Sequence, residues 1–270
     1  MLEIKNLSAS IQGRKIIQDI STVFENGKVN VLLGPNGCGK STLIRSILHL
    51  TRIEQGSILI DGADTKELQP KELAQQIAYM PQSRNVSDIS VKRLILHGRF
   101  PYLSYPRKYR KCDNEIVEQI MKTLEIDHLA DRQIPQLSGG QRQRVYLAMA
   151  LAQETDIIMM DEPATFLDIQ SQLEVMEIVV RLAKEGKNVI MVLHDFESVL
   201  RCADRVFLIN EGKLIKSGNP EDVLTSKETA EVFGVEVCMM QGEDGLHCYV
   251  KRKNDSGSRK AGERAAGLLK

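Results

Sequence analysis

The stretch Gly34-Pro35-Asn36-Gly37-Cys38-Gly39-Lys40-Ser41 matches the phosphate-binding pattern G-x-x-x-x-G-K-[ST], and the rest of the chain is interpreted around it. It follows the apolar run Val29 to Leu33, which predicts a buried strand, and it opens an apolar helical pattern from Leu43 to Leu48. Glycines allow backbone N–H groups to face phosphate oxygens, and Lys40 adds a full charge near the β- and γ-phosphates. Ser41 is placed to ligate Mg²⁺. The alternative is a glycine turn before an ordinary helix. The predicted nucleotide contacts here are Gly34, Asn36, Gly37, Cys38, Gly39, Lys40, Ser41 and Thr42.

Two carboxylates end a second apolar run, Ile157 to Met160. In enzymes with a phosphate-binding loop, the acid at such a strand end belongs to the metal. Side chains alternate along a strand, so the two acids need not share a role. We expect Asp161 to hold Mg²⁺ through water and Glu162 to act as general base on the attacking water. Taken alone, Asp-Glu-Pro is also compatible with an exposed acidic turn.

The pattern of apolar runs predicts an α/β fold. Short runs of the kind buried on both faces of a parallel sheet lie at Ile77 to Met80, Ile157 to Met160, Val189 to Leu193 and Val206 to Ile209. Helical patterns lie between several of them, which favours a layered core. Leu2 to Lys5 and Ile20 to Glu25 are expected to be strands of an N-terminal antiparallel β subdomain, and Lys213 to Lys216 to complete a hairpin at a sheet edge.

The region 84–151 differs from this core, because it shows helical periodicity and loops only. We interpret it as an inserted helical subdomain between core segments 1–83 and 152–250. Asp113 is expected to cap one of its helices, and Arg99 to Arg110 to form an irregular surface loop with aromatic anchors. Tyr102 and Tyr105 are the predicted anchors. Residues 251–270 are polar, glycine-rich and basic, which predicts a disordered tail.

Composition excludes several classes of protein. Lys+Arg and Asp+Glu both number 36, so the formal net charge is zero and no overall basic field favours nucleic acid. No apolar run is long enough to predict a membrane-spanning helix, and we expect a cytoplasmic chain. The five cysteines are scattered, which favours reduced thiols. Cys38 lies beside Lys40 at a helix N-terminus, so we expect it to be the most reactive of them.

A second glycine loop, Leu137-Ser138-Gly139-Gly140-Gln141, begins another helical run. At these residues the sequence resembles the ATP-binding cassette (ABC) family, whose signature is L-S-G-G-Q, and the resemblance extends from Leu2 to about Val237. The resemblance implies an ATPase in which two copies pack head to tail, so that Ser138, Gly139, Gly140 and Gln141 cap the nucleotide on the partner's phosphate-binding loop. It also implies that Gln82 contacts the metal and the lytic water and that His194 touches the γ-phosphate. Asp168 belongs to the family's D-loop, Thr165 to Asp168.

Two positions depart from the family pattern. Many members have an aromatic residue that stacks on adenine, whereas alignment places Ile11 there, which covers a ring face by apolar contact only. In the D-loop, Thr165 and Phe166 stand where Ser and Ala are more frequent.

Several further stretches, among them Gly98 to Pro101 and Phe166 to Ile169, resemble the ATPase subunits of importers for iron-siderophore complexes, haem and cobalamin. The resemblance implies ATP and Mg²⁺ as cofactors. The implied partners are a second copy, two integral membrane permease subunits and, indirectly, a substrate-binding protein. The chain would lie peripherally at the cytoplasmic face of the membrane. A soluble ABC ATPase for DNA repair or cluster assembly is the alternative, and we expect no nucleic-acid partner. The basic cluster Arg107 to Lys111 fits a solvated loop or a contact to lipid headgroups and the permease better than a nucleic-acid patch.

Overall fold

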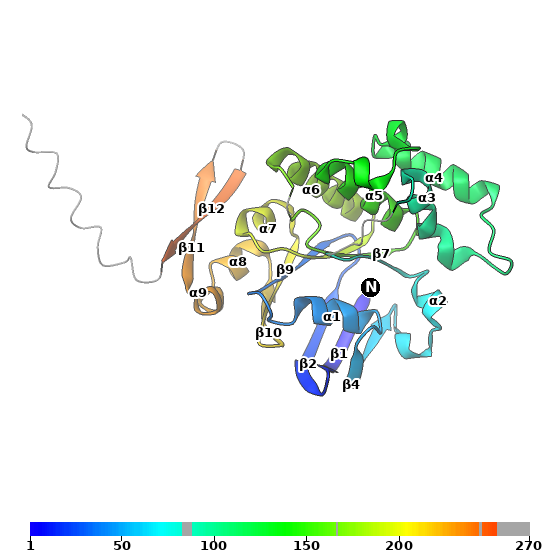
Figure 1. The fold of residues 1–270 in the computed structure, drawn as a ribbon. Helices are drawn as coiled ribbons and strands as arrows, with labels where there is room; N and C mark the ends of the chain where they lie inside the picture. The colour runs from blue at the N-terminus through cyan, green and yellow to red at the C-terminus, as the bar shows by residue number, and fades with distance from the viewer. Residues whose placement is uncertain (83–87, 166, 243–244, 253–270) are drawn as a thin grey trace, which may run out of the picture.

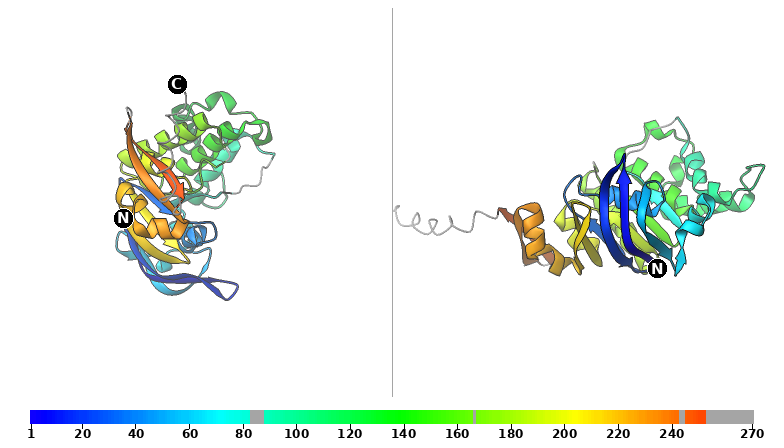
Figure 2. Two further views of the ribbon diagram at one scale, coloured as in Figure 1. Left: turned by 90° about the vertical axis from the view of Figure 1, so that its left-hand side faces the viewer. Right: turned by 90° about the horizontal axis from the view of Figure 1, so that it is seen from below.

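The computed structural model describes residues 1–82, 88–165, 167–242 and 245–252. A central parallel sheet lies between a smaller N-terminal antiparallel sheet and a group of helices, as Figure 1 shows. Figure 2 shows the helices of the green middle segment and the orange C-terminal elements at opposite ends of the molecule. The predicted α/β fold class is therefore confirmed.

The central sheet has six strands in the order β10-β9-β3-β8-β7-β6, of which only β10 is antiparallel to its neighbour. Its strands are β3 (Val29–Leu33), β6 (Ile77–Met80), β7 (Ile157–Asp161), β8 (Asn188–Val192), β9 (Arg205–Asn210) and β10 (Lys213–Gly218). The predicted apolar runs match these strands to within one residue at each end, apart from β10, which extends two residues further than predicted. Because the carboxyl ends of parallel strands meet at one edge, the residues that follow β3, β6, β7 and β8 come together there.

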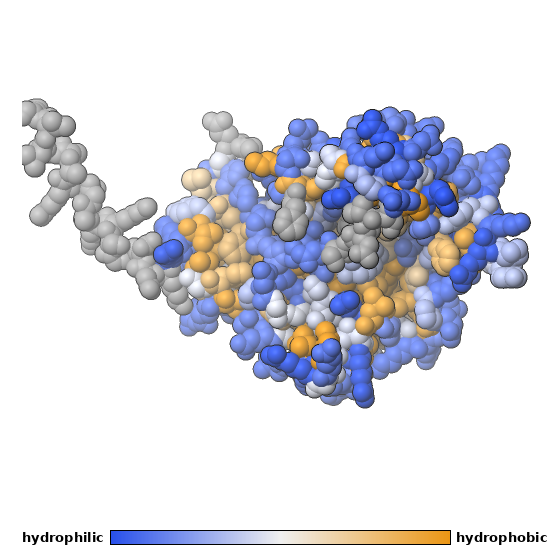
Figure 3. Space-filling model, viewed as in Figure 1, coloured by the Kyte–Doolittle hydropathy of each residue, from blue (hydrophilic) through white to orange (hydrophobic). Residues whose placement is uncertain are grey.

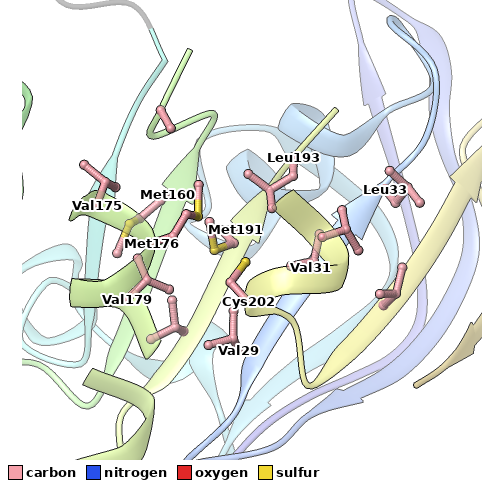
Figure 4. Packing of buried hydrophobic residues seen from close by; sticks show 14 of the residues in the cluster. Val29, Val31, Leu33, Met160, Val175, Met176, Val179, Met191, Leu193 and Cys202 are labelled. Atoms are coloured by element: carbon pink, nitrogen blue, oxygen red, sulfur yellow. The ribbon is translucent and has the colours of Figure 1, made fainter. Parts of the chain in front are cut away.

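Both faces of this sheet are buried, as the apolar runs predict. Val29, Val31 and Leu33 point to one face, where they pack with Met160 of β7, Met191 of β8 and Val179 of the helical layer (Figure 4). Leu32, on the opposite face, packs with the N-terminal sheet and the helix α1 (Lys40–Ile47). This alternation fixes the phosphate-binding loop rigidly to the end of β3.

The N-terminal antiparallel sheet is larger than predicted. It contains β1 (Leu2–Ile11), β2 (Arg14–Phe24), β4 (Arg52–Ile60) and β5 (Ala63–Asp64). The sequence pattern missed much of β1 and β2 because register shifts interrupt the alternation of their side chains. Asn6 and Asp19 adopt left-handed backbone conformations (φ 46° and 54°) near these shifts.

The helical segment contains α3 (Val91–Leu96), α4 (Lys111–Thr123) and α5 (Gly139–Leu151), which share an apolar core of their own. The prediction that Asp113 is the N-cap of α4 is wrong. Arg110 is the N-cap, and Asp113 lies one turn later, where its carboxylate accepts a hydrogen bond from the Arg110 backbone N–H at 2.8 Å. The described residues of this segment form no strand, only an isolated bridge between Ser90 and Gln133.

The predicted aromatic loop is only partly irregular. Residues His97–Tyr102 form a 3-10 helix, η2, in which the Arg99 side chain is buried. Its guanidinium binds Asp113 at 3.2 Å and Glu154 at 2.7 Å. The exposed part of the loop begins at Ser104.

The remaining helices cover the sheet and its edges: α2 (Pro70–Leu73), α6 (Ile169–Lys184), α7 (Phe196–Cys202), α8 (Pro220–Leu224) and α9 (Lys227–Phe233). Short 3-10 turns lie at η1 (Thr65–Glu67), η3 (Asp127–Leu129) and η4 (Ile134–Gln136). A hairpin of β11 (Val235–Gly242) and β12 (Gly245–Arg252) follows, and apolar colour gathers over it in Figure 3. The predicted disordered tail therefore starts too early, because Lys251 and Arg252 belong to β12. The rest of that tail, 253–270, lies outside the described residues.

Candidate functional site

The phosphate-binding loop joins β3 to α1, so its backbone lies at the N-terminus of the helix. Gly34 has to be glycine, since a Cβ there would lie 2.1 Å from the carbonyl oxygen of Ile209. Gly39 adopts φ 113° directly before α1. The buried Lys40 ammonium group donates to the carbonyl oxygens of Gly34 at 2.7 Å and Pro35 at 2.9 Å. These two hydrogen bonds fold the loop backbone around the Lys40 ammonium group.

Asp161 lies at the end of β7, buried next to this loop. One of its carboxylate oxygens, Oδ1, has no hydrogen-bond partner among the described residues. Burial raises the pKa of the Asp161 carboxyl, and a hydrogen bond from Ser41 opposes this shift. A buried carboxylate oxygen without a partner, beside a serine hydroxyl, is the kind of ligand set that a hard divalent cation accepts.

Glu162 follows Asp161 and receives hydrogen bonds from three described side chains. Gln82 Nε2 donates to Oε2 at 2.6 Å, and the Thr165 hydroxyl donates to the same oxygen at 3.0 Å. His194 Nε2 is in hydrogen-bond contact with Oε1. Residues from the ends of β6, β7 and β8 therefore meet at one carboxylate, the side chain of which is only 12% exposed.

A cavity of about 960 Å³ joins these groups. Its lining includes the predicted residues Ile11, Asn36, Gly37, Gly39, Lys40, Ser41, Thr42, Gln82, Glu162 and His194. Gly34 and Cys38 are parts of the loop that do not line it. Sequence reasoning missed Gln12, Arg14 and Ile16, which also line the cavity, and it assigned Thr165 to the D-loop without placing it at the cavity. Arg14 pairs with Ile11 across the first hairpin, a register that the alternation alone did not reveal.

Comparisons with known proteins agree with this geometry. The family profile described as ABC transporter matches residues 17–165. The chain is 38% identical over 262 residues to the petrobactin import ATP-binding protein of Bacillus anthracis, covering 96% of both chains. It is 36% identical over 227 residues to the ferric enterobactin transport ATP-binding protein of Escherichia coli, covering 83% of both chains. The chain belongs to the ABC transporter family.

A solved structure described as an inward-facing ABC transporter of metal-chelate type has the same fold. It superposes with a TM-score of 0.80 at 28% identity, covering 93% of this chain and 96% of the other. The protein is accordingly an ABC ATPase and binds ATP.

The signature loop of this ABC ATPase lies outside the cavity lining. Ser138 caps α5, with its hydroxyl accepting from the Gln141 backbone N–H at 3.3 Å, so the loop forms a helix N-terminus. Gly140 packs closely against α6, since a Cβ there would lie 2.4 Å from Ser171 Oγ. Asp168 caps α6 and accepts from the Ser171 backbone and hydroxyl, both at 2.9 Å. Phe166 lies outside the described residues.

The structure argues against the expectation that Cys38 is the most reactive thiol. Its side chain is buried, and burial raises the pKa of the Cys38 thiol more than the nearby Lys40 ammonium lowers it. Burial also raises the pKa of Cys202 to about 12 and that of Cys248 to about 11. Cys112, on α4, is exposed.

A maleimide reagent at neutral pH is therefore expected to label Cys112 before the buried cysteines, at least about 10-fold faster than Cys38. ATP should give no protection, because Cys112 lies outside the cavity lining. The labelling sites and rates can be read by mass spectrometry of timed samples, with Cys112→Ser and Cys38→Ser as the matched pair. Loss of the fast phase in Cys38→Ser instead of Cys112→Ser would contradict this order.

Proposed function

We propose that this ABC ATPase powers the uptake of an iron chelate, with a siderophore complex as the first candidate and haem or cobalamin as others of the same class. The observation that carries ATP hydrolysis is the Glu162 carboxylate, held by Gln82 and His194 at the edge of the phosphate-binding cavity. The names of its relatives as import and transport proteins support uptake over a role in DNA repair or cluster assembly.

Mg²⁺ fits the donors beside the loop. Asp161 Oδ1, which no described residue contacts by a hydrogen bond, the Ser41 hydroxyl and the Gln82 amide would hold it, Asp161 through water. When bound, the ion neutralises charge on the β- and γ-phosphates. Lys40 binds the same phosphates, His194 contacts the γ-phosphate, and Glu162 accepts the proton of the attacking water.

A second copy of the chain completes the site. The signature residues Ser138, Gly139, Gly140 and Gln141 form a helix N-terminus suited to a phosphate, yet they do not line the cavity of their own chain. A head-to-tail dimer would place each loop over the partner's ATP, with Asp168 near the contact. Ile11 then covers the adenine ring by apolar contact.

Two integral membrane permease subunits and a substrate-binding protein complete the proposed importer, with this chain at the cytoplasmic face of the membrane. Within the described ranges, no helix is both long and apolar enough to cross a bilayer. Copurification of the tagged chain with its permease, followed by uptake of labelled ferric siderophore, haem and cobalamin into cells with and without the chain, tests the proposal. Unchanged uptake of all three ligands in cells that lack the chain would contradict it.

The exposed segment from Ser104 to Lys111, which follows η2, is the proposed permease contact. The two tyrosines predicted as anchors, Tyr102 and Tyr105, have different surroundings in the structure. Tyr102 Oη donates to the Gln153 carbonyl oxygen at 2.7 Å, and the Arg99 guanidinium lies 4.2 Å from the centre of its ring. Tyr102 therefore packs against the core and is a poor anchor for a partner. Tyr105 is 96% exposed, and Arg107 stacks nearby on Phe100.

Replacing Tyr105 with Ala is expected to lower uptake on the order of 10-fold, because aromatic anchors dominate interface energetics. Basal ATPase activity and melting temperature should stay unchanged, because the Tyr105 side chain is almost fully exposed and contributes little to packing. Uptake, ATPase rate and melting temperature are measured on the same variants, with Tyr249→Ala, at the opposite end of the molecule, as control. Equal losses in the Tyr105 and Tyr249 variants would rule out a specific contact.

Tyr102→Ala should lower the melting temperature.

A further inference from the structure

The hydrogen bonds to Glu162 are shared unequally between its two oxygens. Oε2 accepts from both Gln82, at 2.6 Å, and the Thr165 hydroxyl, at 3.0 Å, whereas His194 contacts Oε1. Both oxygens of the carboxylate therefore face protein donors. Three of its approximately four acceptor positions are taken, so a lytic water competes with Gln82 and His194 for Glu162.

Two of these three donors have other tasks once ATP is bound. Under the proposed function, on which this inference rests, Gln82 turns to the metal and the lytic water, and His194 turns to the γ-phosphate. Both then leave Glu162. Thr165 has no such assignment, and of the three donors it alone remains available to the carboxylate.

Thr165 is also tied to Glu162 by the backbone. Its N–H donates to the Glu162 carbonyl oxygen at 3.4 Å, so the two residues close one turn. Glu162 itself adopts φ 53°, in the left-handed region that residues with a Cβ disfavour. An unfavourable backbone conformation held at a reacting residue is a frequent sign of a geometry kept for function.

Thr165 lies where such a role requires it. It lines the nucleotide cavity together with Glu162 and His194, and the same three residues line a smaller hollow of about 210 Å³ between the site and α6 and α7. The Glu162 side chain therefore has space on two sides. A donor within its own turn would restrict it to one direction.

We propose that Thr165 is a positioning residue for ATP hydrolysis: its hydroxyl holds Glu162 Oε2, which leaves Oε1 to accept the proton of the lytic water after Gln82 and His194 have turned to the nucleotide. Thr165 stands where Ser is more frequent in the D-loop, and both residues carry a hydroxyl. In this structure the Thr165 hydroxyl donates to Glu162 Oε2.

Thr165→Val, which keeps the shape and removes the hydroxyl, should lower kcat about 10-fold, as expected for loss of a hydrogen bond to a charged group. KM for ATP should change by less than about 2-fold and the melting temperature by less than about 2 °C, which is on the order of the variation between surface variants. Thr165→Ser should restore kcat. Thr225→Val is the matched control, because the Thr225 hydroxyl donates to a carbonyl oxygen of its own helix, that of Glu221, at 2.8 Å.

A double variant separates positioning from a general structural effect. If Thr165 acts through Glu162, then Thr165→Val should cause no further loss in a Glu162→Gln background. Equal kcat in Thr165→Val and the unmodified chain would overturn the inference, as would failure of Thr165→Ser to restore it. A parallel fall in kcat, ATP affinity and melting temperature would also overturn it. If Glu162→Gln itself turned over normally, the proposed general base would be wrong, which is a distinguishable result.

Discussion

Replacing Glu162 with Gln is expected to lower ATP turnover by about 10²–10⁴-fold, the usual contribution of a general base. The amide preserves the size of the side chain but cannot accept a proton. Lys40 and the backbone of the loop, which we propose bind the phosphates, are unaffected, so ATP affinity should be retained. Bound ATP that is not hydrolysed should then hold two chains together as a stable dimer.

Three measurements on the same protein check this result: phosphate release, binding of a fluorescent ATP analogue, and molar mass by light scattering with ATP and Mg²⁺. Glu185→Gln is a suitable control, because Glu185 is exposed at the end of α6. Near-normal turnover in Glu162→Gln would remove Glu162 from the role of base. Loss of ATP binding would show that the carboxylate contributes to nucleotide affinity instead.

Mixing two inactive variants should restore activity if the ATP site is shared between chains. A Ser138→Arg chain lacks a working signature loop, and a Lys40→Ala chain lacks a working phosphate-binding loop. A mixed dimer retains one intact site, built from Lys40 of one chain and Ser138 of the other. With random pairing at equal amounts, about a quarter of the unmodified activity is expected.

The controls separate loss of the signature contact from loss of the helix cap. Ser138 caps α5, so replacing it should lower the free energy of unfolding by about 1 kcal/mol, and Ser138→Ala measures this capping effect alone. Melting temperatures of the separate chains identify misfolded variants. A mixture as inactive as its components would contradict a shared site if both chains are folded, and full activity of Ser138→Arg alone would exclude the signature assignment.

The parts of the site that sequence reasoning located are those tied to strand ends. Asp161 stands directly after a short apolar run and was located in this way, whereas Gln82 and His194 were identified only through the family resemblance. In the fold all three follow strands of the parallel sheet, and the rule that such strands end at one edge explains why they come together. Contacts between distant segments were less accessible. Tyr102 bonds Gln153, 51 positions away, and burial of Cys38 depends on how the loop packs in the fold.

Two misses had a signal in the sequence. Thr165 stands three residues after Glu162, a spacing at which a side chain reaches back to its neighbour in a turn. In β12 the stretch Leu246 to Val250 is rich in strand-forming residues, but the polar composition that follows it suggested a tail. The N-terminal strands remained underestimated because register shifts cannot be read from a single sequence.

The buried Lys40 ammonium group has a consequence for how the nucleotide is received. Its acceptors are two carbonyl oxygens and, at 3.8 Å, the Cys38 sulfur, so folding has removed water from a full positive charge, which Asp161 offsets without a direct ion pair among the described residues. The cost of that dehydration is met when the chain folds, before any ligand arrives. A phosphate that enters the loop therefore meets a cation already stripped of much of its hydration and fixed in place, and most of their mutual attraction is available for binding.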